Sequence, residues 1–305
     1  MASSKNSIYS ALAANLLIAV TKFAAGLFSN SAAMISEGIH SLVDTINQVL
    51  LLFGLKRSKK PADASRPFGY GRELYFYSFI VSILIFGLGG GISIYQGIIH
   101  ILEPENLGDP TWNYVVLALS VVFEGTSLII AAKEFNKVRG TDSWWTAIVK
   151  SKDPSNFLVL FEDGAAVIGL FIVMICMYFS HRYDMPELDG LASLLVGLLL
   201  VGVSLILARE SRSLLLGEGI SDDSRQKITV ITEKDPSVSK VLRMISSYQA
   251  PEDVVLMLIV AFKEDLDTHE INEAIERIRT DIKKEFSLIN FVIIQPEDIT
   301  HKFKF

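Results

Sequence analysis

Residues 32–55 read AAMISEGIHSLVDTINQVLLLFGL, an apolar run that is long enough to cross a membrane and yet contains ionisable side chains. A spanning helix needs about 20 mostly apolar residues, and one charged side chain near the bilayer centre costs about 2.5–3.5 kcal/mol even on a lenient scale. Glu37, His40 and Asp44 are three and four residues apart, so one helical face presents all three. Such groups usually face the interior of a helix bundle and have a partner there.

The rest of the chain has the composition of a multi-pass membrane protein. Half of its 305 residues are hydrophobic, and the mean hydropathy is +0.39. The net charge of −6 does not favour nucleic acid as a partner, and the single cysteine excludes an internal disulfide and a thiolate cluster. We expect a six-helix transmembrane bundle within residues 1–208, surrounded by membrane lipid, with spans at residues 8–28, 32–55, 74–102, 112–135, 155–180 and 187–208.

Lysine and arginine are unevenly distributed among the loops between these spans. They are frequent between the second and third spans and between the fourth and fifth, whereas the opposite loops contain only Arg182. Because positive charge is retained on the cytoplasmic side, we expect both termini to face the cytoplasm, in a bacterial inner membrane or an organelle membrane. Lys22 lies toward the other end of the first span, where we expect its side chain to snorkel to the interface.

Residues 209–305 are charged and predict a cytoplasmic α/β domain. The segments 221–234 and 268–286 have features of helices, while 238–248, 253–262 and 291–295 have the β-branched and apolar content of strands. The order αββαβ fits a ferredoxin-like, split β-α-β sheet with helices on one face. We expect this domain to regulate the protein and to mediate its dimerisation.

Acids from three predicted spans lie at a similar depth in the bilayer. Counted from the cytoplasmic ends, Asp44, Glu124, Glu162 and Asp163 fall within a slab about 12–22 Å deep. His40, Asp44 and Asp163 together offer imidazole nitrogen and carboxylate oxygen, a donor set that suits Zn²⁺ and also Fe²⁺, Co²⁺, Ni²⁺ or Mn²⁺. Ca²⁺ and Mg²⁺ prefer shells made only of oxygen. A metal site in mid-membrane predicts a transporter whose substrate is a divalent transition metal.

Two motifs extend this interpretation. SNSAAMISEGIHSLVDTINQ, residues 29–48, resembles the second span of the cation diffusion facilitators, the zinc transporter family. RPFGYGRE, residues 66–73, is similar to a cytoplasmic loop of that family, with Arg66 in place of its usual histidine. The resemblance covers nearly the whole chain. It implies a homodimer that exports a divalent cation from the cytoplasm, usually against protons.

The fifth span departs from the family pattern. That pattern has His or Asp, three residues and then Asp, whereas LVLFEDGAAVIG places Val159 at the first position and Asp163 at the second. Glu162, Glu124 or water is a candidate for the missing donor. EDGAAVIG is also similar to a branch of the family that includes a mitochondrial zinc transporter. Glu37 is a further candidate ligand or proton carrier, and Asn47 and Gln48 are expected to orient the ligands through hydrogen bonds.

Other functions are compatible with the same residues. His40 and Asp44 can instead hydrogen-bond between helices, and the missing ligand can mark a non-transporting scaffold or heterodimer subunit. An intramembrane metalloenzyme would need a general base and an open coordination position, and neither an HExxH motif nor a Ser/His pair is evident. We therefore expect a transporter, not an enzyme, with protons as the counter-ion.

Overall fold

The computed structural model describes residues 2–105 and 108–298, which divide into two compact units. The first unit comprises Met1–Lys56 and Leu74–Arg212, and the second comprises Arg57–Glu73 and Ser213–Phe305. The loop between the second and third predicted spans thus groups with the C-terminal residues. The domain boundary at residue 208 stays a prediction.

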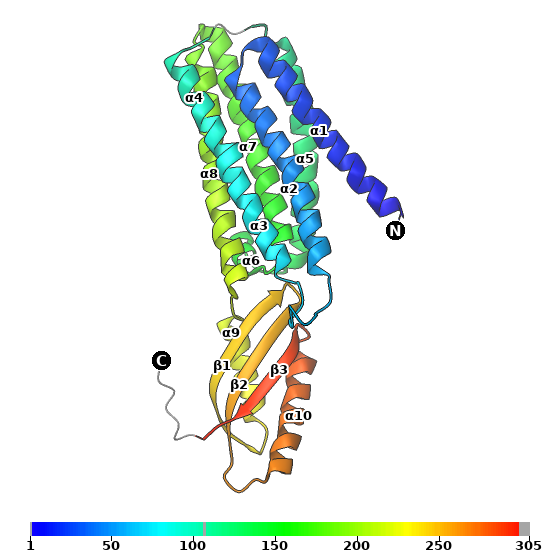
Figure 1. Ribbon diagram of the computed structural model, residues 1–305. Coiled ribbons are helices and arrows are strands. Elements are labelled where there is room, and N and C mark those ends of the chain that lie inside the picture. The colour runs from blue at the N-terminus through cyan, green and yellow to red at the C-terminus, as the bar shows by residue number, and fades with distance from the viewer. Residues whose placement is uncertain (1, 106–107, 299–305) are drawn as a thin grey trace. The chain divides into compact units, whose positions relative to one another are not determined.

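The first unit is a bundle of helices (Figure 1). Its elements are α1 (Ala2–Ser29), α2 (Ala32–Ser58), α3 (Glu73–Leu84), η1 (Ile85–Gly91), α4 (Ile92–Leu102), α5 (Thr111–Arg139), α6 (Trp144–Lys150), α7 (Pro154–Tyr183) and α8 (Glu187–Leu216). Among the described residues, five helical stretches are long and apolar enough to cross a membrane, and they match predicted spans two to six. The first predicted span lies in α1, where a shorter apolar stretch covers Asn15–Ser29. The helical membrane fold is confirmed.

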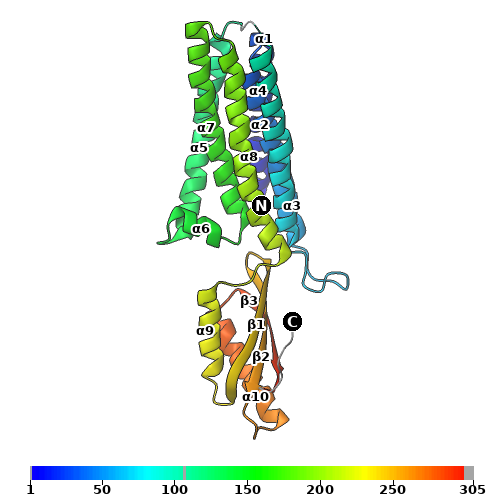
Figure 2. The same ribbon diagram turned by 90° about the vertical axis from the view of Figure 1, so that its left-hand side faces the viewer.

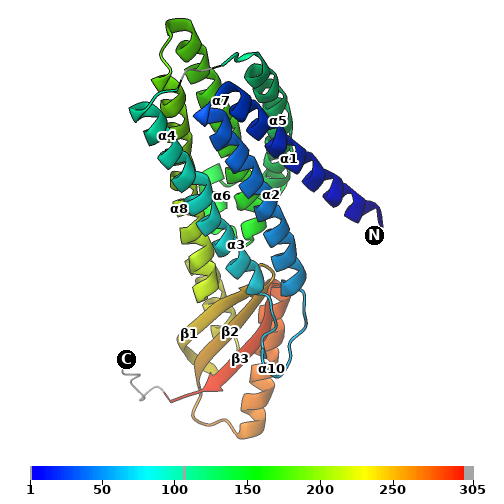
Figure 3. The same ribbon diagram turned by 45° about the horizontal axis from the view of Figure 1, so that its top comes forward.

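A tight turn joins α1 to α2. Asn30 has a φ of 52°, a left-handed conformation that asparagine adopts more readily than most residues. Asp189 of α8 then holds the start of α2, since its carboxylate accepts hydrogen bonds from the Ser31 hydroxyl at 2.5 Å and from the Ala33 amide at 3.1 Å. The carboxylate thereby satisfies an amide that has no partner within the helix. Beyond this turn, α1 diverges from the other helices toward its N-terminus (Figures 1 and 3).

The third predicted span is not one regular α-helix. Residues Ile85–Gly91, with the sequence IFGLGGG, form a π-helical segment between α3 and α4. Beyond it, Gly90 and Gly97 approach α8 so closely that a Cβ atom would lie 2.6 Å from Val201 Cγ2 and 2.5 Å from the Leu194 amide nitrogen, respectively. On α8, Gly190 and Gly197 approach the backbone of α4 in the same way. Small residues of this kind let membrane helices pack backbone to backbone.

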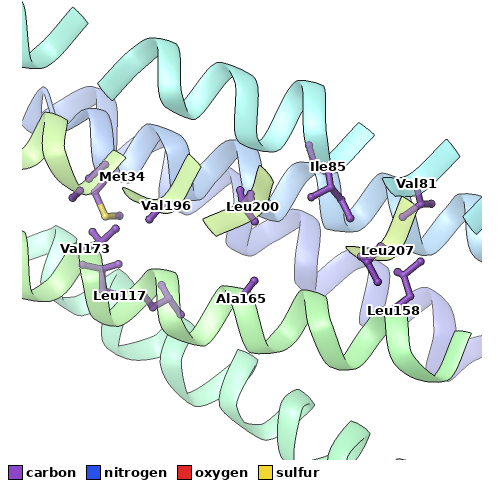
Figure 4. Close-up of a cluster of buried hydrophobic side chains, with 14 of the residues drawn as sticks. Met34, Val81, Ile85, Leu117, Leu158, Ala165, Val173, Val196, Leu200 and Leu207 are labelled. Atoms are coloured by element: carbon purple, nitrogen blue, oxygen red, sulfur yellow. The ribbon is translucent and has the colours of Figure 1, made fainter. Parts of the chain in front are cut away.

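Apolar side chains fill the space between the other helices of the bundle. Figure 4 shows part of this cluster, to which α2, α3, η1, α5, α7 and α8 contribute Met34, Val81, Ile85, Leu117, Leu158, Ala165, Val173, Val196, Leu200 and Leu207. Because lipid is as apolar as these side chains, close packing favours the helix contacts more than the removal of apolar surface from water does. The packed helices hold the polar residues of α2, α5 and α7 in place.

The second unit contains α9 (Asp222–Glu233), β1 (Val238–Ala250), β2 (Asp253–Phe262), α10 (Thr268–Glu285) and β3 (Ile289–Pro296). The predicted order αββαβ is confirmed. The strands pair in the order β1-β2-β3, antiparallel between β1 and β2 and parallel between β2 and β3. The helices lie together on one face of the sheet (Figure 2). No strand separates β2 from β3 in the described sheet, so the expected split arrangement is wrong: the parallel strands pair directly.

The loop Arg57–Glu73 is ordered by its own polar contacts. Asp63 accepts hydrogen bonds from the Ser65 hydroxyl at 2.7 Å, from the Tyr70 hydroxyl at 2.7 Å and from the Arg66 amide at 2.9 Å. These donors, with the Ser65 hydroxyl foremost, lower the pKa of Asp63 to about 2. Glu73 pairs with Arg57 at 3.2 Å, and the expected ion pairs of this loop are therefore present.

Candidate metal centre

The centre of α2 carries a buried histidine–aspartate pair. His40 Nε2 lies 3.4 Å from Asp44 Oδ2 across one helical turn, as the four-residue spacing predicts. The His40 residue is only 2% exposed, and its Nε2 atom and the Asp44 Oδ1 atom have no hydrogen-bond partner among the described residues. A buried polar atom without a partner is costly, so these two atoms are suited to an ion or a proton.

Side chains of neighbouring helices hold the two acids of α7. Asp163 Oδ2 accepts a hydrogen bond of 2.6 Å from the Ser127 hydroxyl on α5, and Glu162 Oε1 accepts one of 2.7 Å from the Asn47 amide on α2. Glu162 is buried. Asn47 therefore orients a candidate donor, the role expected for it from the sequence. Ser127 does the same for Asp163.

These groups line one cavity of about 410 Å³ between α1, α2, α5 and α7. Its charged lining residues, within the described part of the chain, are all acids: Asp44, Glu124, Glu162 and Asp163. Gln48 also lines it, as does Val159, the residue at the position of the absent ligand. Four carboxyl groups around one cavity in an apolar bundle attract cations strongly.

The candidate ligands do not meet at one point. Across residues 2–105 and 108–298, no three or more His, Cys, Asp or Glu side chains are grouped closely enough to hold one metal ion. His40 contacts Asp44, while Glu162 and Asp163 are held by their hydrogen-bond donors on other helices. The predicted set thus surrounds a shared space without forming a coordination shell.

Glu37 and Lys22 form a separate ion pair. Lys22 Nζ lies 3.0 Å from Glu37 Oε2 and donates a hydrogen bond of 2.8 Å to the Ser41 hydroxyl. The expectation that Lys22 snorkels to the interface is wrong, since Lys22 is 0% exposed: an internal carboxylate satisfies its ammonium. Sequence reasoning also missed Ser127, although it lies three residues after Glu124 and therefore near the same helical face.

Comparison with known proteins supports this geometry. Residues 8–216 match the family description of the cation efflux transmembrane domain. The chain belongs to the cation efflux family, which confirms the resemblance to the cation diffusion facilitators. Within this family it is 38% identical over 249 residues to a protein of Xenopus laevis named proton-coupled zinc antiporter SLC30A9, mitochondrial. The match covers 81% of this chain and 43% of that protein, so the chain spans less than half of this relative's length.

Two further similarities extend over different parts of the chain. Metal tolerance protein C4 of Arabidopsis thaliana is 30% identical over 266 residues, which cover 87% of this chain and 57% of that protein. Among solved structures, a nickel form of the MamM C-terminal domain matches 26% of this chain and 98% of its own, at 15% identity and a TM-score of 0.24. The antiporter and tolerance-protein matches agree with the domain match in placing the chain among metal transporters of the cation efflux family.

Proposed function

We propose that this chain transports divalent transition-metal ions, Zn²⁺ foremost, across a membrane in exchange for protons. The observation that carries the proposal is the cavity of α1, α2, α5 and α7, where a His–Asp pair and three further acids surround one space inside an apolar bundle. The names of the SLC30A9 relatives, proton-coupled zinc antiporters, support zinc and protons as the exchanged ions. Export from the cytoplasm by a homodimer completes the proposal.

His40, Asp44 and Asp163 bind the metal ion in this mechanism, with Glu162 as a further donor. Each must be deprotonated to bind, so arrival of the metal releases protons and the return of protons releases the metal. An unperturbed imidazole titrates near pH 6.5, which suits His40 to this exchange. Glu124 adds negative charge to the cavity, and Asn47 and Ser127 hold the carboxylates in place until the ion arrives.

The proposal is tested with purified protein in liposomes that contain a zinc-sensitive and a pH-sensitive dye. We expect His40→Ala and Asp44→Asn to abolish zinc-driven proton flux, since each removes a ligand from the pair. Asn113→Ala is the matched control, because Asn113 is a buried polar residue that bonds to Ser29 away from the cavity, and its flux should persist. Unchanged flux in both ligand variants would refute the assignment. A panel of Zn²⁺, Mn²⁺, Fe²⁺, Co²⁺ and Ni²⁺ would determine the substrate.

A second function is favoured by one observation. Val159 lines the cavity at the position where the family pattern has a ligand, which fits a non-transporting scaffold or heterodimer subunit with an incomplete site. Calorimetry on the isolated chain separates the two proposals. Stoichiometric binding of Zn²⁺ that Asp44→Asn abolishes supports the transporter, whereas absence of binding to the wild type supports the scaffold.

A further inference from the structure

A buried cation of the protein itself lies beside the candidate metal site. Lys22 of α1 contacts Glu37 and Ser41, which are one turn apart on α2. His40 and Asp44 are on the same part of this helix. Ser41 also lines the acidic cavity, so the ammonium and the cavity share one hydroxyl group. Lys22 therefore lies where a positive charge affects what the cavity binds.

Glu37 has the position of a further metal ligand. It lies three residues before His40, near the same helical face, and is 0% exposed. Its Oε2 atom is held by Lys22, but its Oε1 atom has no hydrogen-bond partner among the described residues. On the opposite side, α7 approaches Oε1 so closely that a Cβ atom at Gly169 would lie 3.1 Å from it. The carboxylate is thus confined between α1 and α7, in the layer that the candidate ligands share.

We propose that Lys22 is a specificity-determining residue that keeps Glu37 out of the metal-binding set. This inference rests on the proposed transport function. An ammonium group has three donors and no acceptor, so it cannot bind a metal ion and it engages the carboxylate that would. With Glu37 engaged, the set retains the mixed nitrogen and oxygen character that suits Zn²⁺. A released Glu37 adds hard carboxylate oxygens, which favour Mn²⁺ relative to Zn²⁺.

A simpler role for the pair is to fasten α1 to α2. An ion pair with that role alone changes the thermal stability when it is removed and weakens the binding of all metals alike. A specificity-determining pair instead changes the ratio of the Mn²⁺ and Zn²⁺ affinities. The ratio is therefore the measurement that separates the two roles.

The experiment uses the full chain in nanodiscs, with Zn²⁺ and Mn²⁺ affinities measured by competition against a metal-sensitive dye. We expect Lys22→Met to raise the affinity for Mn²⁺ relative to Zn²⁺ about tenfold, the effect of one additional charged interaction. Lys22→Arg keeps the positive charge and should retain the wild-type ratio. The double variant Lys22→Met/Glu37→Gln should return to the wild-type ratio, because the released carboxylate is gone.

Two further variants make the outcome decisive. Lys22→Gln removes the charge and keeps an amide that donates to Glu37 and Ser41, so it should shift the ratio in the same direction even where Lys22→Met fails to fold. A wild-type ratio in Lys22→Gln and in any folded Lys22→Met overturns the inference. Asp44→Asn tests the proposed function separately: if this variant binds Zn²⁺ as the wild type does, the metal site itself is misassigned.

Discussion

Asn47 and Ser127 each hold one acid of the cavity through a single hydrogen bond. Asn47 donates to Glu162 at 2.7 Å, and Ser127 donates to Asp163 at 2.6 Å. Partners that orient metal ligands typically contribute 10- to 100-fold to metal affinity. The two residues thus link α2 and α5 to the donors of α7, and each can be removed without touching a candidate ligand.

We predict that Asn47→Ala weakens zinc binding about 10- to 100-fold, because Glu162 loses the donor that orients it. Calorimetry with Zn²⁺ measures the effect. Asn113→Ala removes a comparable buried amide that donates to the Ser29 hydroxyl at 2.8 Å, and its affinity should equal that of the wild type. Equal affinity in both variants would show that Glu162 does not bind the metal in the protein.

The loop aspartate Asp63 gives a prediction on pH. Its pKa of about 2 lies below the value of about 3.9 for an unfolded aspartate, because the hydroxyl of Ser65 and then that of Tyr70 donate to the charged carboxylate. The stability that this group contributes is therefore complete above pH 4 and is lost as the pH falls through 2. Carboxyl NMR should find a higher Asp63 pKa in Ser65→Ala and in Tyr70→Phe. A pKa near 3.9 in the wild type would show that these hydrogen bonds are absent in solution.

Residue spacing predicts only some of the site. The His40–Asp44 pair follows from a four-residue interval within one helix, and the common cavity of Asp44, Glu162 and Asp163 agrees with their predicted depth. The Lys22–Glu37 pair could not be foreseen, since it depends on how two antiparallel helices align after the turn at Asn30. Depth alone does not reveal which side chain a buried ammonium reaches.

Helices α4 and α8 meet through glycines on both sides. Gly90 and Gly97 lie against α8, while Gly190 and Gly197 lie against α4. With a Cβ atom at Gly97 only 2.5 Å from the Leu194 nitrogen, no rotation of a flexible side chain can relieve the overlap. The contact is therefore sensitive to a single methyl group.

We predict that Gly97→Ala lowers the free energy of unfolding by about 1–3 kcal/mol, the usual cost of overpacking, because the two backbones must separate. Thermal unfolding in detergent, followed by circular dichroism, measures the change. Gly202→Ala in α8 is the control, since no atom of a neighbouring residue lies within 4 Å of the position that its new methyl group would take. This variant should be as stable as the wild type or slightly more stable. Equal loss in both variants would contradict the close approach.

Predictability differs between the elements as well. Hydropathy predicts the long apolar helices and the αββαβ order because both depend on local composition and periodicity. The short helix α6 and the π-helical segment Ile85–Gly91 were not predicted. A π segment carries no distinct hydrophobic pattern, and the direct pairing of β2 with β3 depends on the long-range order of the strands.

At the scale of the whole molecule, the two compact units suggest a division of tasks. The cavity and its candidate ligands belong to the first unit. The second unit has its own apolar core, which includes Ile228, Leu256, Leu258, Ile278 and Val292. We infer that the second unit mediates dimerisation while the first binds metal.

We predict that removing residues 217–305, which follow α8, weakens the dimer more than it weakens zinc binding. Light scattering in detergent measures the oligomeric state, and calorimetry measures the binding of Zn²⁺ by the same sample. Asp44→Asn in the full chain is the converse control, which should lose zinc binding and keep its oligomeric state. Loss of both properties to the same extent after truncation would contradict the division.

The wide turn in the third span has a consequence for insertions and deletions. Twelve residues separate Ile85 from Gly97, and at about 100° a residue a regular helix would leave these two positions about 120° apart. A π bulge takes up one surplus residue, which reduces the offset to about 20° and keeps both positions on the inner side. A shortened chain that lacks Gly87 should therefore form an uninterrupted α-helix there and still direct Gly97 at its neighbour, whereas the loss of a residue elsewhere in the span would turn that face toward lipid.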